Sequence, residues 1–492
     1  MRPISNTTLR GLLAAVVLAT FAAPLAAQQT PNRSKPPAAG PAPALHLPAI
    51  EKLQLSNGLP VWIVEMHEVP VVQVSLVLST GSADDPPGKF GVASLAMAML
   101  TEGAGSRSAL EIADAVDFLG ADLDASSGID SSAVRLHVPA ARLAAALPIM
   151  ADVAQRPTFP ADELERQRDD RLTGLLQARD DPPTIAALAF ARVLYGPEHR
   201  FGTATVGTGT TIAAFTADDL RAFYRSAIRP DNATLLVVGD VTRSTVVPLL
   251  ESAFGAWRAD GPAPAHRTLP TVGERTAREV YIVDKPGAPQ SQVRIGSVAV
   301  PRSTPDYFPI QVMNTILGGS FSSRLNLNLR EEHGYTYGAG SSFDMRAAPG
   351  PFAATAGVQT DKTSESLTEF FKELDKISET VPADELARAK NYVALRFPGG
   401  FETTADISRR LEELLVYKLP DDYFAKYVQN IQAVSAADVR RVARKYIQTG
   451  RFAVVIAGDR ATIEPGVKAL NLGPIHELSV EDVFGPEPKI GQ

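Results

Sequence analysis

Residues 160–164 read PADEL, and the same five letters recur at 382–386, 222 positions further along the chain. Two other blocks repeat at an offset of 219. Gly239-Asp240 matches Gly458-Asp459 near the ends of the halves, and Pro70 matches Pro289 near their starts. The three blocks keep the same order at nearly one offset, and such a long period indicates a tandem duplication of one domain.

Each repeat combines strand and helix patterns. Residues 72–78 and 134–138 show the period of two that is typical of strands, and 161–179 form a charged helical segment that ends before Pro182. The second half predicts strands near 280–283, 292–297, 352–358 and 452–457. We therefore expect an α+β fold of two tandem homologous domains. Each would be a mostly antiparallel sheet with helices packed on one face, and together they would form a clamshell.

The repeat and two Pro-rich segments predict the domain boundaries. We expect a signal peptide (1–27), a Pro/Ala-rich linker (28–48), an N-terminal domain (49–258), an interdomain linker (259–275), a C-terminal domain (276–482) and a tail (483–492). Pro-rich segments of this kind extend as tethers because they cannot bury enough surface to fold.

The first 27 residues have the layout of an export signal. Arg2 and Arg10 precede an uncharged apolar stretch that ends in small residues, which predicts cleavage near Ala27. The stretch is short for a membrane span and contains Pro24, although an uncleaved anchor remains the alternative. We expect a periplasmic or secreted protein with no membrane span after cleavage.

Composition excludes several classes of function. The 492 residues contain no Cys, which rules out disulfides, thiolate metal sites and Cys nucleophiles. With 48 basic and 55 acidic residues, the formal charge is −7, which argues against a nucleic-acid partner because such proteins usually present a basic face.

Several motifs resemble the pitrilysin or insulinase-like (M16) zinc metallopeptidases over roughly residues 50–480. The most specific is GGSFSSRLNLNLREEHGYTYG at 318–338. The others are Ser56-Asn57-Gly58-Leu59, Gly81-Ser82 before Gly91-Val92-Ala93, Tyr195-Gly196 with His199-Arg200-Phe201-Gly202, and Arg229-Pro230-Asp231-Asn232. The resemblance implies a zinc site in the first half, on the segment of helical composition at 88–102.

The zinc motif that the resemblance implies is degenerate in this chain. Catalytic relatives carry His-x-x-Glu-His, in which two imidazoles four residues apart reach one ion and the Glu polarises the bound water. Here the two His positions fall on Ser94 and Ala98, and the Glu position falls on Met97. The family's third ligand, a Glu 75–80 residues later, corresponds to the stretch Thr173, Gly174, Leu175 and Leu176.

We therefore expect that this chain binds no catalytic zinc. Its seven histidines, at 46, 67, 137, 199, 266, 333 and 476, include no pair three to five residues apart. A zinc site assembled from distant residues remains the alternative.

The second half keeps two residues that, in the family, contact the substrate at the scissile bond. They correspond to Arg330 and Tyr337, seven residues apart. A guanidinium grips carbonyls or carboxylates, and a phenol can donate to an oxyanion. The structural alternative is that Arg330 pairs with Glu331 or Glu332 while Tyr337 packs in the core. Arg324 is a weaker candidate, and Gly318, Gly319 and Gly338 are expected to shape turns.

A chain without the metal ligands but with the substrate pair resembles the non-catalytic subunit of two-chain M16 peptidases. We expect a zinc-bearing partner in a heterodimer, in which Arg330 and Tyr337 complete the site for peptides or unfolded segments. Those would bind as an added strand on a sheet edge. The alternatives are a homodimeric peptide-binding scaffold or holdase without proteolysis, and an active metalloendopeptidase with unorthodox ligands.

Overall fold

The computed structural model describes residues 40, 48–259, 261 and 268–489. The predicted export segment and most of the linker that follows it lie outside these residues. None of the helices in the described ranges is long and apolar enough to cross a lipid bilayer.

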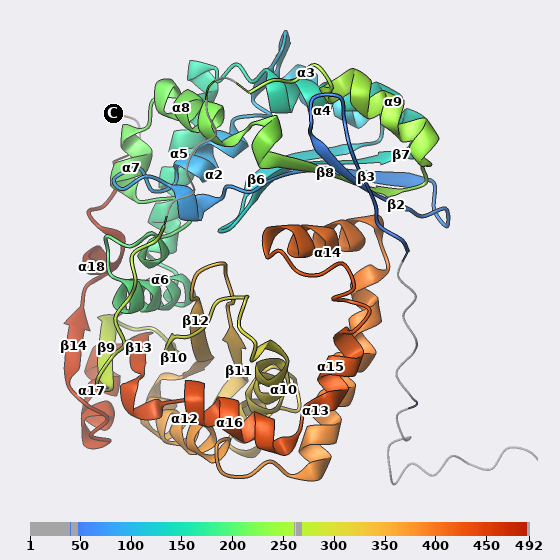
Figure 1. Ribbon diagram of the computed structural model, residues 1–492. Helices are drawn as coiled ribbons and strands as arrows, with labels where there is room; N and C mark the ends of the chain where they lie inside the picture. Colours follow the sequence, from blue (N-terminus) through green and yellow to red (C-terminus); the bar gives the residue numbers. More distant parts are fainter. Residues whose placement is uncertain (1–39, 41–47, 260, 262–267, 490–492) are drawn as a thin grey trace, which may run out of the picture. The chain divides into compact units, whose positions relative to one another are not determined.

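The first half builds a mixed six-stranded sheet in the order β1-β2-β8-β3-β7-β6 (Figure 1). Only the pairing of β2 with β8 is parallel. The strands are β1 (Glu51–Gln54), β2 (Pro60–Glu65), β3 (Val71–Leu78), β6 (Asp122–Ser127), β7 (Ser132–Pro139) and β8 (Ala233–Gly239). A two-stranded hairpin of β4 (Gly103–Ala104) and β5 (Arg107–Ser108) lies outside this sheet.

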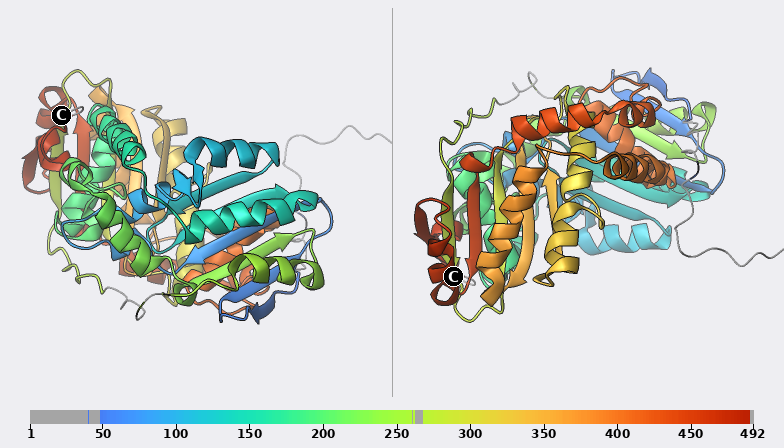
Figure 2. Two further views of the ribbon diagram at one scale, coloured as in Figure 1. Left: turned by 90° about the horizontal axis from the view of Figure 1, so that it is seen from above. Right: turned by 90° about the horizontal axis from the view of Figure 1, so that it is seen from below.

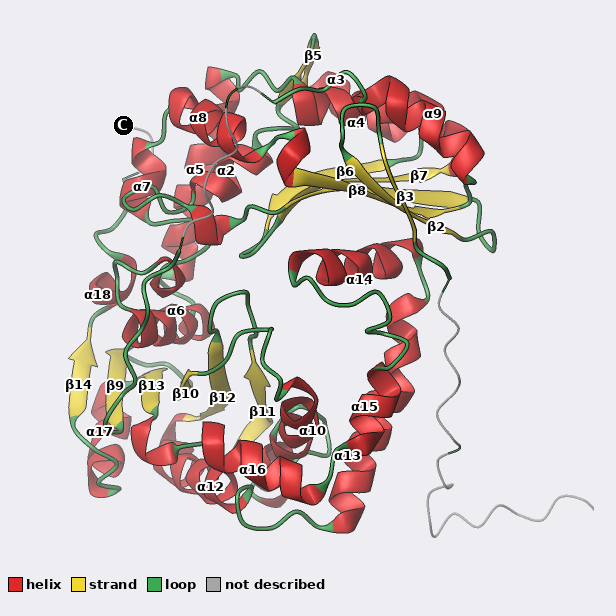
Figure 3. Cartoon of the chain, viewed as in Figure 1, coloured by secondary structure: helices red, strands yellow, loops and turns green. Residues whose placement is uncertain are grey.

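The second half repeats this sheet, in the order β11-β12-β10-β13-β9-β14 (Figure 3). Its strands are β9 (Glu279–Asp284), β10 (Gln290–Val298), β11 (Thr336–Phe343), β12 (Pro351–Gln359), β13 (Ala453–Gly458) and β14 (Ile475–Leu478). Each strand from β9 to β13 takes the place of its repeat counterpart. The two sheets differ at one edge, where β14 runs parallel to β9 but β1 runs antiparallel to β2. The predicted α+β fold with two sheets is confirmed.

The helices of the first half lie between and after its strands along the chain. They are α2 (Val92–Ala98), α3 (Ala109–Phe118), α4 (Leu143–Gln155), α5 (Ala161–Ala178), α6 (Pro182–Tyr195), α7 (Gly209–Ala214), α8 (Ala217–Ala227) and α9 (Arg243–Phe254). The second half contributes α10 (Tyr307–Leu317), α11 (Arg324–Asn326), α12 (Thr363–Lys376), α13 (Ala383–Arg396), α14 (Thr404–Val416), α15 (Tyr427–Ala433), α16 (Ala436–Tyr446), α17 (Arg460–Ala469) and α18 (Val480–Phe484).

The two halves exchange one helix each. The α14 helix belongs to the second half but packs on β3 and β8 of the first sheet, while α6 of the first half packs on β10 and β13 of the second sheet (Figures 1 and 2). The two helices are equivalents in the repeat, because their N-caps, Asp181 and Thr403, are 222 residues apart. Each sheet therefore has helices of its own half on one face and one helix of the other half on the opposite face.

This exchange explains why β8 is buried along its whole length. Leu235 and Val237 face the core formed with α2, α4 and α9. Leu236 and Val238 face the opposite core, which also contains Leu411 of α14. A strand covered on both faces requires a continuous apolar run rather than an alternating one, as residues 233–239 show.

Local signals account for most helix ends, and one prediction needs correction. The segment 88–102 is helical only over α2, because the backbone forms turns on both sides of that helix. Pro182 ends the charged segment as predicted, but it also begins α6. Proline fits the first turn of a helix, where its missing N–H is not needed, and the Asp181 side chain caps the same turn by accepting from the Thr184 amide.

Candidate functional site

A buried ion pair anchors the α2 helix, on which the family's zinc motif would lie. The Asp85 carboxylate accepts the Gly91 and Ala93 amides at 2.7 and 2.9 Å, and the Nε of Arg200 donates to it at 2.9 Å. Both side chains are almost completely buried. Burial raises the pKa of Asp85, while the Arg200 guanidinium and the two amides oppose that rise. The start of α2 is thus held by charge-assisted hydrogen bonds.

The three degenerate motif positions lie together on α2 but present no metal ligand. Ser94 and Ala98 are half-buried, one turn apart, and Met97 is fully buried in the core of the first half. Arg171 of α5 reaches this face of α2. Its Nη1 donates to the Ser94 hydroxyl at 3.0 Å, and its Nη2 donates to the Ser94 carbonyl oxygen at 3.1 Å.

The guanidinium of Arg171 therefore lies beside Ser94, the first position of the degenerate zinc motif. Burial lowers the pKa of Arg171, although an arginine remains protonated at any pH where the protein is folded. The positive charge beside Ser94 would repel a divalent cation. Within the described ranges, no group of three or more His, Asp and Glu side chains is placed to hold a metal ion.

Arg330 and Tyr337 lie side by side on the second half. Arg330 is on a π-helical turn, Leu327–Glu332, and Tyr337 is on β11, which forms one edge of the second sheet. The guanidinium carbon of Arg330 lies 4.9 Å from the ring centre of Tyr337 and 4.7 Å from that of Phe321, which is the range of cation–π contacts. Arg330 also pairs with Glu331 at 3.2 Å.

The tyrosine is fully presented to solvent rather than packed in the core. Its exposed fraction is 86%, and the pairing of β11 with β12 is irregular between Thr336 and Ala339. Tyr337 and Gly338 of β11 there lie opposite the single residue Gly357 of β12, which is a β-bulge. Such bulges re-aim side chains at strand edges. The structural alternative is therefore right for the Arg330–Glu331 pair and wrong for the burial of Tyr337.

An exposed aromatic side chain, Phe321, lies beside this pair. The described part of the chain has seven exposed large hydrophobic residues, and Phe321, Leu327 and Tyr337 all come from the 318–338 block. We call Phe321, Arg330 and Tyr337 the aromatic–arginine patch. Aromatic and Arg side chains are the types most enriched in binding surfaces.

The weaker candidates of the same block have structural positions. Arg324 is buried, pairs with Glu385 at 2.6 Å and donates to the Thr380 carbonyl oxygen at 2.8 Å. A Cβ at Gly318 would lie 2.2 Å from the Ser341 amide nitrogen, so this glycine allows the loop to approach β11. A Cβ at Gly338 would meet nothing closer than 3.8 Å.

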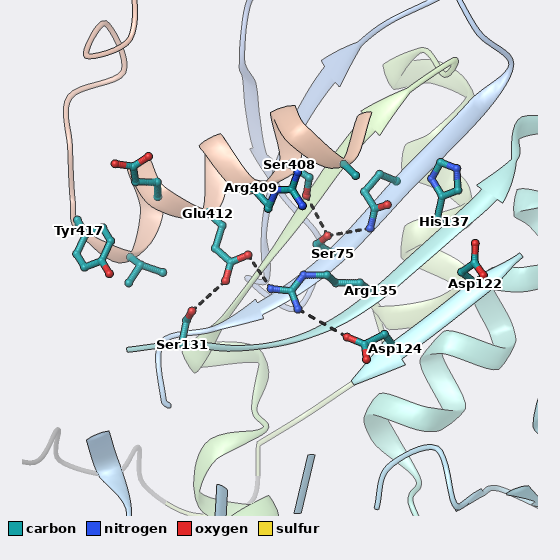
Figure 4. Close-up of a pocket in the computed structure, with 14 residues that line it drawn as sticks. Ser75, Asp122, Asp124, Ser131, Arg135, His137, Ser408, Arg409, Glu412 and Tyr417 are labelled. Atoms are coloured by element: carbon teal, nitrogen blue, oxygen red, sulfur yellow. Dashed lines mark hydrogen bonds and ion pairs between the residues drawn. The ribbon is translucent and has the colours of Figure 1, made fainter. Parts of the chain in front are cut away.

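A cavity of about 640 Å³ lies between the first sheet and α14 (Figure 4). One ion pair and two hydroxyl contacts join the two halves across this cavity. Arg135 donates to Glu412 at 2.8 Å, the Ser131 hydroxyl donates to the same carboxylate at 2.9 Å, and the hydroxyls of Ser75 and Ser408 are 3.0 Å apart. These bonds hold α14 on the sheet, so we assign the cavity a structural role.

Two residues of these sites were not predicted from the sequence. Arg171 precedes the stretch 173–176 by only two residues, but nothing in its sequence context indicates that it reaches Ser94. Phe321 had a weak signal, since it is a lone aromatic residue within the Gly/Ser-rich segment 318–323.

Two family models match the chain, one in each half. The model of insulinase (peptidase family M16) matches residues 61–189, and the model described as the peptidase M16 inactive domain matches residues 214–393. The chain belongs to the M16 peptidase family.

Similar proteins and solved structures cover most of the chain. An uncharacterised zinc protease of Streptomyces coelicolor is 27% identical over 80% of this chain and 86% of its own length. A crystal structure of a peptidase M16 inactive domain from Pseudomonas fluorescens is 28% identical, with a TM-score of 0.77, over 83% of this chain and 98% of that one. A Helicobacter pylori protease at 22% identity shares the fold, with a TM-score of 0.78 over 84% and 100% of the two chains.

Proposed function

We propose that this chain is a non-catalytic subunit of an M16-type metallopeptidase. It binds a peptide and completes the active site of a zinc-bearing partner through Arg330 and Tyr337. The observation that carries the proposal is the exposed aromatic–arginine patch in a chain whose motif positions hold Ser94, Met97 and Ala98. A zinc ion in the partner would polarise the water, and this chain would supply the groups that grip the substrate.

Each residue of the patch has a chemical task in this proposal. The Arg330 guanidinium, in contact with the rings of Phe321 and Tyr337, would bind a peptide carbonyl or carboxylate. The Tyr337 hydroxyl would donate to the oxyanion of the tetrahedral intermediate. A peptide would bind along the edge of β11, because an edge strand offers unpaired backbone groups to an added strand.

The decisive experiment is purification of the tagged chain from its native host. A co-purifying chain of similar size with an intact zinc motif supports the proposal, whereas a homodimer without peptidase activity supports a scaffold or holdase. In the reconstituted pair, Tyr337→Phe should lower kcat by about 10²–10³-fold, the range for loss of one oxyanion donor. The control for Arg330→Ala is Arg388→Ala, an exposed arginine outside the patch. Unchanged turnover in both patch variants would refute the shared site.

Relatives described as zinc proteases support a second candidate, an active zinc protease. Metal analysis of the purified protein distinguishes an active zinc protease from a non-catalytic subunit. One zinc per chain in the purified protein, removed by a chelator together with peptidase activity, would establish this candidate and refute the non-catalytic role. We expect no stoichiometric zinc.

Export to the periplasm is part of the same proposal. It is supported by the signal-like residues 1–27, and N-terminal sequencing of the native protein tests it. A mature chain that begins at Gln28 is the expected result, and a chain that retains residues 1–27 would indicate a membrane anchor.

A further inference from the structure

A second cavity, of about 490 Å³, lies beside α5 and is separate from the aromatic–arginine patch. Its volume is within the range of about 300–1,000 Å³ that is usual for small-molecule sites. The walls are mainly apolar and include Leu175, Leu188, Phe201 and Phe484. None of the described residues that line it is Asp or Glu.

Three arginines line this cavity, and their charges are balanced to different degrees. Arg200 is neutralised by Asp85, and Arg346 pairs with Asp344 at 2.6 Å. Arg171 has no carboxylate within ion-pair distance among the residues that the structure describes. Two of its nitrogens donate to Ser94, and its Nε is buried without a hydrogen-bond partner in that part of the chain.

This arrangement leaves one positive charge without a counter-ion in a largely apolar cavity. A buried charge is costly unless it is paired, and an anion in the cavity would remove that cost. The planar guanidinium fork matches the geometry of a carboxylate. The apolar walls suit an alkyl or aryl group attached to the charged end.

We propose that the cavity beside α5 binds a monocarboxylate with an apolar body, its carboxylate paired with Arg171. The proposal does not depend on the shared-site function, because this cavity and Arg171 lie outside the aromatic–arginine patch. The same ligand chemistry occurs in fatty acids and at the apolar C-terminal ends of peptides.

Titration calorimetry with four probes on the purified chain tests the proposal and separates the two sources. The probes are octanoate and N-acetyl-Ala-Leu as the free acid, each compared with its primary amide. We expect at least one acid to bind at least tenfold more tightly than its amide, which corresponds to about 1.4 kcal/mol. Binding of octanoate assigns the site to fatty acids, and binding of the dipeptide assigns it to chain ends.

Three variants test whether the acid binds in this cavity and pairs with Arg171. Arg171→Met should weaken acid binding at least tenfold, while Arg166→Met, an exposed arginine on the same helix, should leave it unchanged. Gly174→Leu is the second variant in case Arg171→Met does not fold. A Cβ at Gly174 meets nothing within 4 Å, so the leucine adds bulk at the cavity wall and should also reduce binding.

Three outcomes would overturn the proposal. The first is that neither acid binds, and the second is that acids and amides bind equally well. The third is wild-type affinity in Arg171→Met or, if that variant does not fold, in Gly174→Leu.

Discussion

Replacing Leu411 by alanine tests whether α14 stabilises the sheet of the other half. Leu411 is 4% exposed and lies one turn from Ser408, whose hydroxyl bonds to Ser75 of β3. Its side chain belongs to the core that contains Leu236 and Val238 of β8. Truncation of a buried leucine to alanine costs about 2–5 kcal/mol, because it removes buried methyl groups and leaves a cavity.

The expected loss should appear in the first half although the substitution is in the second. Amide hydrogen exchange of β3 and β8 should accelerate, by about 30-fold for a loss of 2 kcal/mol, if exchange follows the opening equilibrium. The control is Leu395→Ala on α13, which removes the same atoms from a side chain that is 43% exposed. Unchanged exchange in β3 and β8, or equal effects of the two substitutions on the unfolding free energy, would refute the assignment of α14 to the first sheet's core.

Three further predictions concern single residues. Gly174→Ala should raise the unfolding free energy in urea by about 0.5–1 kcal/mol, because the site is in a helix and a Cβ there meets no atom within 4 Å; a loss of stability would contradict this. Gly91→Ala should lower thermal stability by about 1–3 kcal/mol or more, since the residue has a φ of +102° and its Cβ would lie 2.3 Å from the Val206 carbonyl oxygen; a wild-type melting temperature would contradict this. Burial alone raises the pKa of Asp306, but hydrogen bonds from Tyr446, Arg441 and Lys445 lower it to about 2. Asp306→Asn should therefore cost about 2 kcal/mol at pH 7, and its difference from the wild type should disappear as the pH falls from about 4 to 2, which unfolding curves over that range can check.

The sequence predicted local elements well because their signals are local. The predicted helical segment 161–179 coincides with α5, and the predicted strand 134–138 lies within β7. The edge strands β6 and β11 were not predicted, since their segments are rich in polar and small residues and lack a clear apolar alternation.

The exchange of α6 and α14 could not be predicted from the sequence. Both helices have apolar faces, and nothing in the order of residues states whether such a face covers the sheet of its own half or the other. The same limit applies to Arg171, whose contact with Ser94 depends on how α5 packs beside α2. At the candidate site, the sequence already placed Arg330 and Tyr337 in the block 318–338. The bulge that exposes Tyr337, however, depends on how β11 pairs with β12.

The exchanged helices make each half of the chain dependent on the other. Either half alone would leave the apolar face of its sheet without a cover, and its own helix would be left without a sheet. Two copies of a single ancestral half, however, could exchange this helix between chains, as in a domain-swapped dimer. Each copy would then cover the apolar sheet face of the other. Fusion of the two copies would retain that exchange of helices within one polypeptide. The repeat would then be a record of an old homodimer as well as of a gene duplication.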